Sequence, residues 1–417
     1  MQTDDNSKAD ESIISSSRCY CPYRQASLLR QALTPDKMRI AFVIGAGCPA
    51  SIQISEGEQK SRPLIPAISG LTKQVQESIQ GDVSLNKALT AITNRLAQNG
   101  RNLNIEEILT HVRTLIEVVG RGTIDGLSKN DLESLDKEIC KQTTDIVNVP
   151  LPENDTGYHR LAAWIGGIQR SHPIEVFTPN YDLLMEQALE QCRVPYFDGF
   201  VGSHNTFFDI ASIEHDNLPS RWSRLWKMHG SINWWRTANG NVERRESGQE
   251  EDRQMIYPSH LKYDQSRRLP YLAMLDRMKA FLSQGQAVLV TCGYSFSDQH
   301  LNEIILQGLS GNPTAVCFGL LWGDLSEYSE AVNRAKKRSN LSLLAVDAAV
   351  LNTIEGTWQA EVKESNILHG IAVQTEKIEG RTRSPDERCK FLLGDFDSFG
   401  KFLAQQLQYS EDNGEKM

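Results

Sequence analysis

Four short segments of this sequence combine glycine with side chains that hydrogen-bond or exchange protons. They are Gly45-Ala46-Gly47, Asn180 with Asp182, His229, and Gly293 with Ser295. A glycine turn lets backbone N–H groups approach a phosphate closely, and histidine is the side chain that titrates near neutral pH. These residue types therefore favour a nucleotide-binding site in which the histidine is a candidate base.

Each segment lies just beyond the carboxyl end of a predicted strand. The strands are 40–45, 174–177, 225–228 and 287–291, with further candidates at 315–321 and 341–346. Helices are expected at 24–33, 159–168, 182–189 and 271–282. Strands that alternate with helices predict an α/β fold, a doubly wound, mostly parallel, Rossmann-like sheet, and such open sheets bind ligands at their carboxyl edge.

The glycine turn alone is weak evidence for a nucleotide site. The full dinucleotide fingerprint has a third glycine and an immediate helix, whereas Cys48 and Pro49 follow here. Residues 54–72 are punctuated by glycine and proline and are expected to form an extended loop.

The polar residues also have purely structural interpretations. Asn180 is suited to cap the helix that follows it, and Asp182 is suited to its first turn. A histidine beside a glycine, such as His229, is often held by hydrogen bonds with no role in catalysis. Ser295 and Asp298 are candidate caps for the next helix.

The segment 71–150 reads as helical throughout. Apolar residues recur at three- and four-residue spacings between 105 and 119, after Asn104, a candidate cap. We expect a helical insertion that is a lid, an oligomerisation surface or a structural layer. The predicted division is a polar tail at 1–25, a Rossmann-like domain at 26–70 and 151–350, the insertion at 71–150, and a C-terminal extension at 351–417 that docks on the core.

Composition places the chain among ordinary globular proteins. Its 417 residues are 40% hydrophobic and 23% charged, and no apolar run approaches a membrane span. The N-terminus has no signal-peptide pattern, and the eight cysteines form no CxxC pair, so we expect reduced thiols and a cytoplasmic location. A net charge of −9 gives no strong signal for direct nucleic-acid binding.

The order of these motifs resembles the sirtuin NAD-binding domain. Gly45-Ala46-Gly47, Thr178-Pro179-Asn180-Tyr181-Asp182, His229-Gly230 and Gly293-Tyr294-Ser295 are similar to the GAG, TQNID, HG and GTS or GSS motifs of that family. The resemblance covers residues 38–52 and 155–310. It implies that NAD+ is bound as a substrate.

The sequence departs from sirtuin deacylases in one chemical respect. It has no cysteine between Cys192 and Cys292, so the four-cysteine zinc module of that family cannot be built there, and no zinc is expected. In this respect the chain resembles the zinc-free, sirtuin-like NAD hydrolases of bacterial antiphage systems. That resemblance implies a homo-oligomer and a partner such as a HerA-type ATPase or an Argonaute-like protein.

By the same resemblance, each site residue has an implied role. Asn180 binds the ribose and positions water, His229 is the base, and Asp182 holds the nicotinamide carboxamide. The segment Gly45-Ala46-Gly47 serves the diphosphate, and Gly293 and Ser295 serve the adenosine side. Three classes stay open: an NAD+ hydrolase, a zinc-free deacylase or ADP-ribosyltransferase, and a non-catalytic NAD or ADP-ribose sensor.

Overall fold

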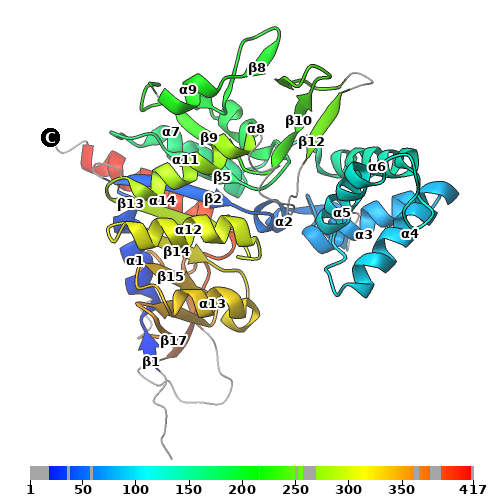
Figure 1. Ribbon diagram of the computed structural model, residues 1–417. Coiled ribbons are helices and arrows are strands. Elements are labelled where there is room, and N and C mark those ends of the chain that lie inside the picture. The colour runs from blue at the N-terminus through cyan, green and yellow to red at the C-terminus, as the bar shows by residue number, and fades with distance from the viewer. Residues whose placement is uncertain are drawn as a thin grey trace, which may run out of the picture.

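The computed structural model describes residues 18–34, 38–56, 60–215, 217–248, 252–256, 269–360, 366–375 and 387–414. A large sheet with parallel central strands lies at its centre (Figure 1). In order across the sheet these strands are β15 (Leu341–Leu344), β14 (Val316–Leu320), β13 (Ala287–Cys292), β2 (Arg39–Ile44), β5 (Glu175–Thr178), β9 (Ser223–Lys227) and β6 (Tyr196–Phe197). Each of the predicted strands is present, with boundaries shifted by at most two residues.

The strand order reverses between β2 and β13. From β2 the chain proceeds through β5 to β9 on one side, and the later strands β13, β14 and β15 extend the sheet on the other side. A reversal of this kind leaves a crevice beyond the carboxyl ends of the two strands, because their connections leave on opposite sides. The loops after β2 and β13 therefore border the natural ligand site of this sheet.

Helices cover both faces of the sheet. Along β2, Ile40 and Phe42 enter one hydrophobic core, whereas Ala41 and Val43 enter the other. The first core includes α1 (Pro22–Ala32), α7 (Gly157–Gly167), α8 (Leu184–Gln191) and α14 (Phe396–Gly414). The second includes α11 (Tyr271–Ser283), α12 (Gln299–Gly311) and α13 (Ser329–Ala335). Because both sets of side chains are buried, the strand is continuously apolar, and the predicted doubly wound α/β fold is confirmed.

The segment predicted as helical forms a unit to one side of the sheet (Figure 1). It contains α3 (Ile68–Ile79), α4 (Val83–Gln98), α5 (Ile105–Val118) and α6 (Lys129–Val147). Asn104 caps α5, as expected, by accepting a hydrogen bond from the Glu107 backbone N–H at 2.8 Å. We call α3–α6 the helical unit.

Two predictions around the glycine turn are wrong. A short helix, α2 (Gly47–Ser51), does follow the turn, with Pro49 in the first turn, where the missing N–H has no partner to lose. The expected loop at 54–72 contains a hairpin of β3 (Gln53–Glu56) and β4 (Lys60–Pro63) and the beginning of α3. These strands are short and polar, so the sequence carries no alternating hydrophobic signal for them.

Two further strand groups were not predicted. An antiparallel sheet contains β7 (Phe200–Val201), β8 (Thr206–Phe208), β11 (Val242–Arg244), β10 (Gly230–Arg236) and β12 (Arg253–Ile256), with α9 (Ile210–His215) beside it. At the edge of the main sheet lie β16 (Ala348–Leu351), β17 (Ile354–Ala360), β18 (Val373–Thr375), β19 (Glu387–Phe391) and β1 (Arg18–Tyr20), and η1 (Leu325–Tyr328) precedes α13. The region after 351, which appeared weakly patterned, thus begins with strands that extend the sheet.

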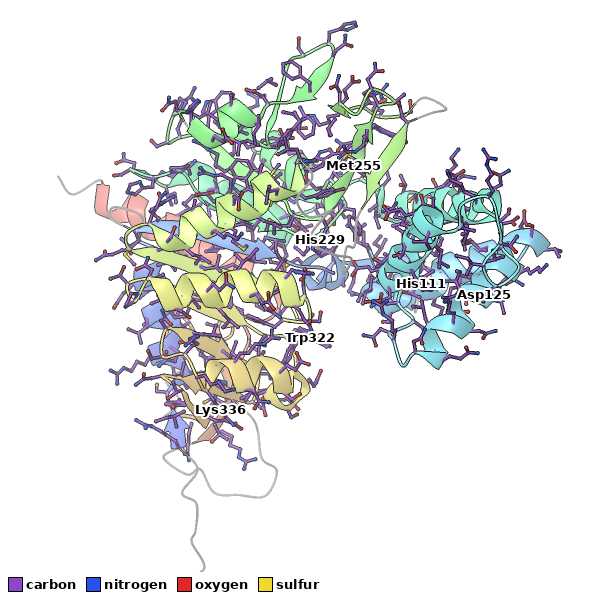
Figure 2. All side chains as sticks on the ribbon, in the orientation of Figure 1. His111, Asp125, His229, Met255, Trp322 and Lys336 are labelled. Carbon is purple, nitrogen blue, oxygen red and sulfur yellow. The ribbon has the colours of Figure 1, made fainter. Side chains whose placement is uncertain are left out.

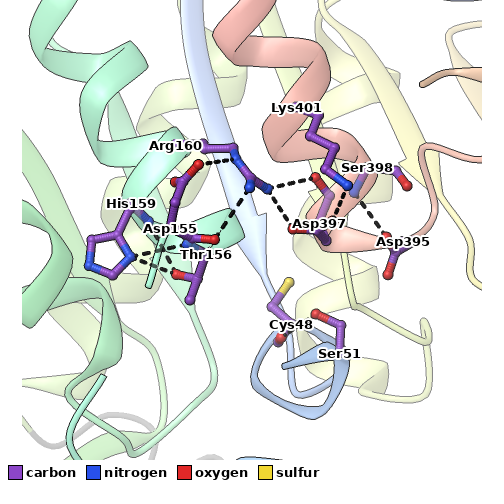
Figure 3. A network of polar contacts seen from close by, with 10 residues as sticks. All are labelled: Cys48, Ser51, Asp155, Thr156, His159, Arg160, Asp395, Asp397, Ser398 and Lys401. Atoms are coloured by element: carbon purple, nitrogen blue, oxygen red, sulfur yellow. Dashed lines mark hydrogen bonds and ion pairs between the residues drawn. The ribbon is translucent and has the colours of Figure 1, made fainter. Parts of the chain in front are cut away.

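The C-terminal helix α14 packs against α7. Its apolar residues Phe396, Phe399, Phe402 and Leu403 are all buried, in agreement with the expected docking of the C-terminal extension on the core. At the polar edge of this contact, Arg160 of α7 bridges Asp155 at 2.8 Å and Asp397 of α14 (Figure 3). Lys401 also pairs with Asp397, at 2.8 Å. The predicted tail, the loop at 243–252 and the C-terminal extension lie partly outside the described residues.

Candidate functional site

One cavity of about 520 Å³ opens between the carboxyl edge of the sheet and the helical unit. This volume is in the range of small-molecule sites. The residues that line it on the sheet side are Ala46, Pro49, Pro179, Asn180, Tyr181, Asp182, His229, Gly293, Tyr294, Ser295, Ser297, Asp298, Gln299 and His300. The helical unit and the segment before it contribute Ile65, Pro66, Ile68, Leu71, Arg101, Asn102, Asn104, Glu106, Glu107 and Val147. The cavity lies at the reversal of strand order described above.

The glycine turn at the end of β2 is held tightly against the loop after β13. The N–H groups of Gly45 and Gly47 donate to the carbonyls of Cys292 and Gly293, at 3.0 and 2.9 Å. A Cβ on Gly45 would lie 2.3 Å from the Gly293 carbonyl oxygen. In this conformation the two glycines permit close contact between backbones, and their N–H groups are engaged within the protein. Ala46 is the member of the turn that lines the cavity.

Asn180 is anchored to this same turn. Its side-chain amide nitrogen donates to the Gly45 carbonyl at 3.1 Å, and its backbone N–H donates to Thr178 Oγ1 at 3.0 Å. The structural alternative, a cap for α8, is wrong, because α8 begins after Leu183 with no side-chain cap. One N–H of its side-chain amide is thus used within the protein, and Asn180 lines the cavity.

Asp182 lies deeper and has a partly structural role. Its Oδ1 accepts from the Leu184 backbone N–H at 3.0 Å, at the start of α8. Burial raises the pKa of Asp182 to about 6, although the nearby Lys227 ammonium acts in the opposite direction. Lys227 is itself buried and pairs with Glu186 at 3.0 Å. The Asp182 carboxyl group lines the cavity, and its pKa is close to neutral pH.

His229 follows β9 and faces the side on which the helical unit lies (Figure 2). Its Nε2 lies 2.9 Å from Asp298 Oδ2. Its Nδ1 is buried and has no hydrogen-bond partner among the described residues. A buried polar atom of this kind needs an explanation, and a bound ligand that donates a hydrogen bond would supply one.

Opposing effects act on the proton affinity of His229. Burial lowers its pKa, but the hydrogen bond to Asp298, the charge of Asp298 and the charge of Glu106 outweigh burial, so the pKa is raised. When the imidazole is neutral, an Nε2–H donated to Asp298 leaves the lone pair on Nδ1. The geometry is that of a base oriented by a carboxylate.

The loop after β13 completes this side of the cavity. Gly293 has φ +63°, and a Cβ there would lie 2.5 Å from the Cys48 backbone nitrogen, so the position favours glycine. Ser295 lines the cavity and shares a hydrogen bond of 2.8 Å with Ser297. Of the two candidate caps for α12, Asp298 is the cap, through bonds from the His300 and Leu301 N–H groups.

Most of the predicted site residues thus lie around one cavity. Sequence reasoning missed three carboxylates that also line it, Asp298 beside His229, and Glu106 and Glu107 of α5. Asp298 was considered only as a helix cap. Glu106 lies far from every motif in sequence, and the pattern of α5 indicated only that it belongs to the first turn of a helix.

Two searches of the structure gave no candidate. No group of three or more His, Cys, Asp or Glu side chains arranged to hold a metal ion occurs among the residues that the structure describes. Within the same residues, no helix is long and apolar enough to span a membrane.

Comparisons with known proteins show a similarity over part of the chain. Residues 174–343 match the model of the SIR2-like domain. No curated protein matches the sequence. A solved structure described as "Structural Basis for the Mechanism and Regulation of Sir2 Enzymes" matches with 11% identity and a TM-score of 0.34, over 72% of this chain and 84% of that one. The chain therefore carries, over residues 174–343, a region similar to the SIR2-like domain, and this region contains Asn180, His229 and Ser295.

Proposed function

We propose that this chain is an NAD+ glycohydrolase that cleaves NAD+ to nicotinamide and ADP-ribose. One observation carries the proposal. Asn180 and His229, from loops after two different strands, line one cavity beside the reversal of strand order, and His229 Nδ1 is buried there without a partner. The match to the SIR2-like domain supports NAD+ as the ligand class.

The cavity offers a group for each part of NAD+. Ala46, Gly293 and Ser295 belong to the loops after β2 and β13, where the strand order reverses, and we place the diphosphate and the adenosine there. Asp182 lines the cavity beside Asn180, where we place the nicotinamide carboxamide. In its protonated form the Asp182 carboxyl group both donates and accepts, as the two ends of a carboxamide require, and burial raises its pKa to about 6.

The reaction breaks the bond between the ribose C1′ and the nicotinamide nitrogen. The bonding electrons move to the ring nitrogen, positive charge develops on the ribose, and a water oxygen bonds to C1′. Asn180 is fixed by its bond to Gly45, so its carbonyl oxygen is a rigid acceptor for that water or for a ribose hydroxyl. His229 Nδ1 accepts a hydrogen bond from a ribose hydroxyl, takes its proton as the transition state forms and returns it after water has added to C1′. The surplus proton of the water leaves to solvent.

We further propose that the enzyme is the effector of an antiphage system. The sequence resemblance supports this role, together with a homo-oligomeric state and a HerA-type ATPase partner. Unrestrained NAD+ hydrolysis would harm the host, so restraint is required. The helical unit forms one wall of the cavity, and its position offers a means of controlling entry.

Nicotinamide release from NAD+ tests the assignment. A positioned base contributes about a hundred- to ten-thousand-fold to a rate, so His229→Ala is expected to lower turnover at least about a hundred-fold. Asn180→Ala is expected to do the same. His172→Ala is the matched control, since His172 is exposed. Turnover near that of the wild type in a folded His229→Ala or Asn180→Ala sample would contradict the proposal.

A further inference from the structure

Glu106 is one of the two carboxylates, with Glu107, that the helical unit places in the cavity. It belongs to the first turn of α5 and lines the cavity together with Asn180 and His229. It lies outside the region similar to the SIR2-like domain, which begins at residue 174. The helical unit therefore contributes ionisable side chains to a site whose Asn180 and His229 come from the sheet.

The position of Glu106 is fixed by a single strong contact. Tyr181 O–H donates to Glu106 Oε1 at 2.9 Å. Tyr181 directly follows Asn180, and its own carbonyl accepts from the Ile232 backbone N–H at 3.1 Å. Burial, followed by the charge of Glu106, raises the pKa of Tyr181 well above its ordinary value, so the phenol stays a donor. The bond thus ties the carboxylate to the loop that carries Asn180.

Among the described residues, no basic side chain forms an ion pair with Glu106, whereas the adjacent Glu107 pairs with Arg101 at 2.8 Å. The negative charge of Glu106 also acts on the candidate base, since it contributes to the raised pKa of His229. An ionised carboxylate only accepts hydrogen bonds, and a second oxygen is left for a donor in the cavity.

We propose that Glu106 is a catalytic residue that accepts the proton of the attacking water, so that the helical unit completes the active site. This inference rests on the proposed NAD+ hydrolysis. As the water oxygen bonds to C1′ and the C1′–nicotinamide bond breaks, one water proton passes to Glu106 and then to solvent, and the hydroxyl stays on ADP-ribose. The carboxylate charge also stabilises the positive ribose of the transition state.

Two substitutions distinguish a catalytic role of Glu106 from a purely structural one. Glu106→Gln keeps an oxygen that accepts from Tyr181 but loses the charge and the proton acceptor. Tyr181→Phe loses the bond between them but keeps the carboxylate. A catalytic role predicts a larger loss of kcat in Glu106→Gln than in Tyr181→Phe, and a structural role predicts the reverse order.

The experiment measures nicotinamide release from NAD+ between pH 5 and 9, and ADP-ribose binding by calorimetry. Glu77→Gln, an exposed carboxylate of α3, is the control. We expect kcat of Glu106→Gln to fall at least about a hundred-fold with ADP-ribose affinity kept, and the acid limb of its residual activity to move to lower pH. A wild-type kcat in Glu106→Gln would overturn this inference, and so would a loss that affects only its ADP-ribose affinity. The proposed function would still be tested separately by His229→Ala. Absence of nicotinamide release by the wild-type chain would overturn both.

Discussion

Asp298→Asn isolates one contact of the candidate site. Asp298 Oδ1 caps α12 by accepting from His300 and Leu301 N–H groups at 2.9 and 3.1 Å. Its Oδ2 pairs with His229 Nε2. Asparagine is as good a helix cap as aspartate, so α12 is expected to be preserved. The contact with the histidine changes, because a neutral amide replaces the carboxylate.

The structure sets the size of the effect. A hydrogen bond to a charged group contributes about 1.5–3 kcal/mol. If this energy is lost in the transition state, turnover falls about ten- to a hundred-fold, since each 1.36 kcal/mol corresponds to a factor of ten. The carboxylate also raises the pKa of His229. Its removal lowers that pKa, so the base stays deprotonated to lower pH and the acid limb of the rate profile shifts downward.

The assay is the pH profile of nicotinamide release for the wild type, Asp298→Asn and Asp276→Asn. Asp276 is an exposed carboxylate of α11 and serves as the matched control. Thermal unfolding of all three checks that α12 is intact. A folded Asp298→Asn with the turnover and the acid limb of the wild type would refute the view that Asp298 orients His229.

Three further predictions concern stability. Gly45→Ala is expected to lower the unfolding free energy by about 1–3 kcal/mol, because its Cβ would meet a carbonyl oxygen at 2.3 Å. Gly311→Ala is the control and is expected to have little effect, because a Cβ there would have no atom within 4 Å. Equal melting temperatures of the two variants would contradict the packing argument. Because burial raises the pKa of Asp182 to about 6, this group favours the folded state below pH 4 and loses that contribution as pH rises through 6. Asp182→Asn is therefore expected to flatten the pH dependence of urea unfolding between pH 4 and 6, and an unchanged slope would count against the shift. Phe399→Ala is expected to lower the free energy of unfolding, measured by chemical denaturation, by about 3–5 kcal/mol. The loss in Phe207→Ala is expected to be far smaller, because Phe399 is buried and Phe207 is 50% exposed. Similar losses in the two variants would show that α14 is not part of the core.

The central sheet was predictable because its strands are buried on both faces. A run such as residues 40–44 is apolar at every position, since alternate side chains enter two separate cores. The edge strands β17–β19 and the hairpin β3–β4 lack such runs, because they are short or only partly covered. Their pairing depends on tertiary contacts that local sequence does not encode.

The candidate site was predictable only where a residue follows a strand. Asn180 and His229 could be placed at one edge because parallel strands end there together. Asp298 had a sufficient local explanation as a cap, which hid its second contact. Glu106 lies 74 positions before Asn180 in the chain, and only the packing of the helical unit brings it to the cavity. The glycines of the turn were expected to approach a phosphate, but their N–H groups are bound to the neighbouring loop.

The most direct test of hydrolysis is the ratio of free ADP-ribose to nicotinamide formed from NAD+ by the purified chain with no acceptor added, alone and with a candidate ATPase partner. The proposed function predicts equal amounts of the two products from the wild type, and neither product from His229→Ala beyond about a hundredth of that rate. Nicotinamide release that requires an acyl-lysine peptide or a protein acceptor, with no free ADP-ribose, would contradict hydrolysis and indicate a transferase.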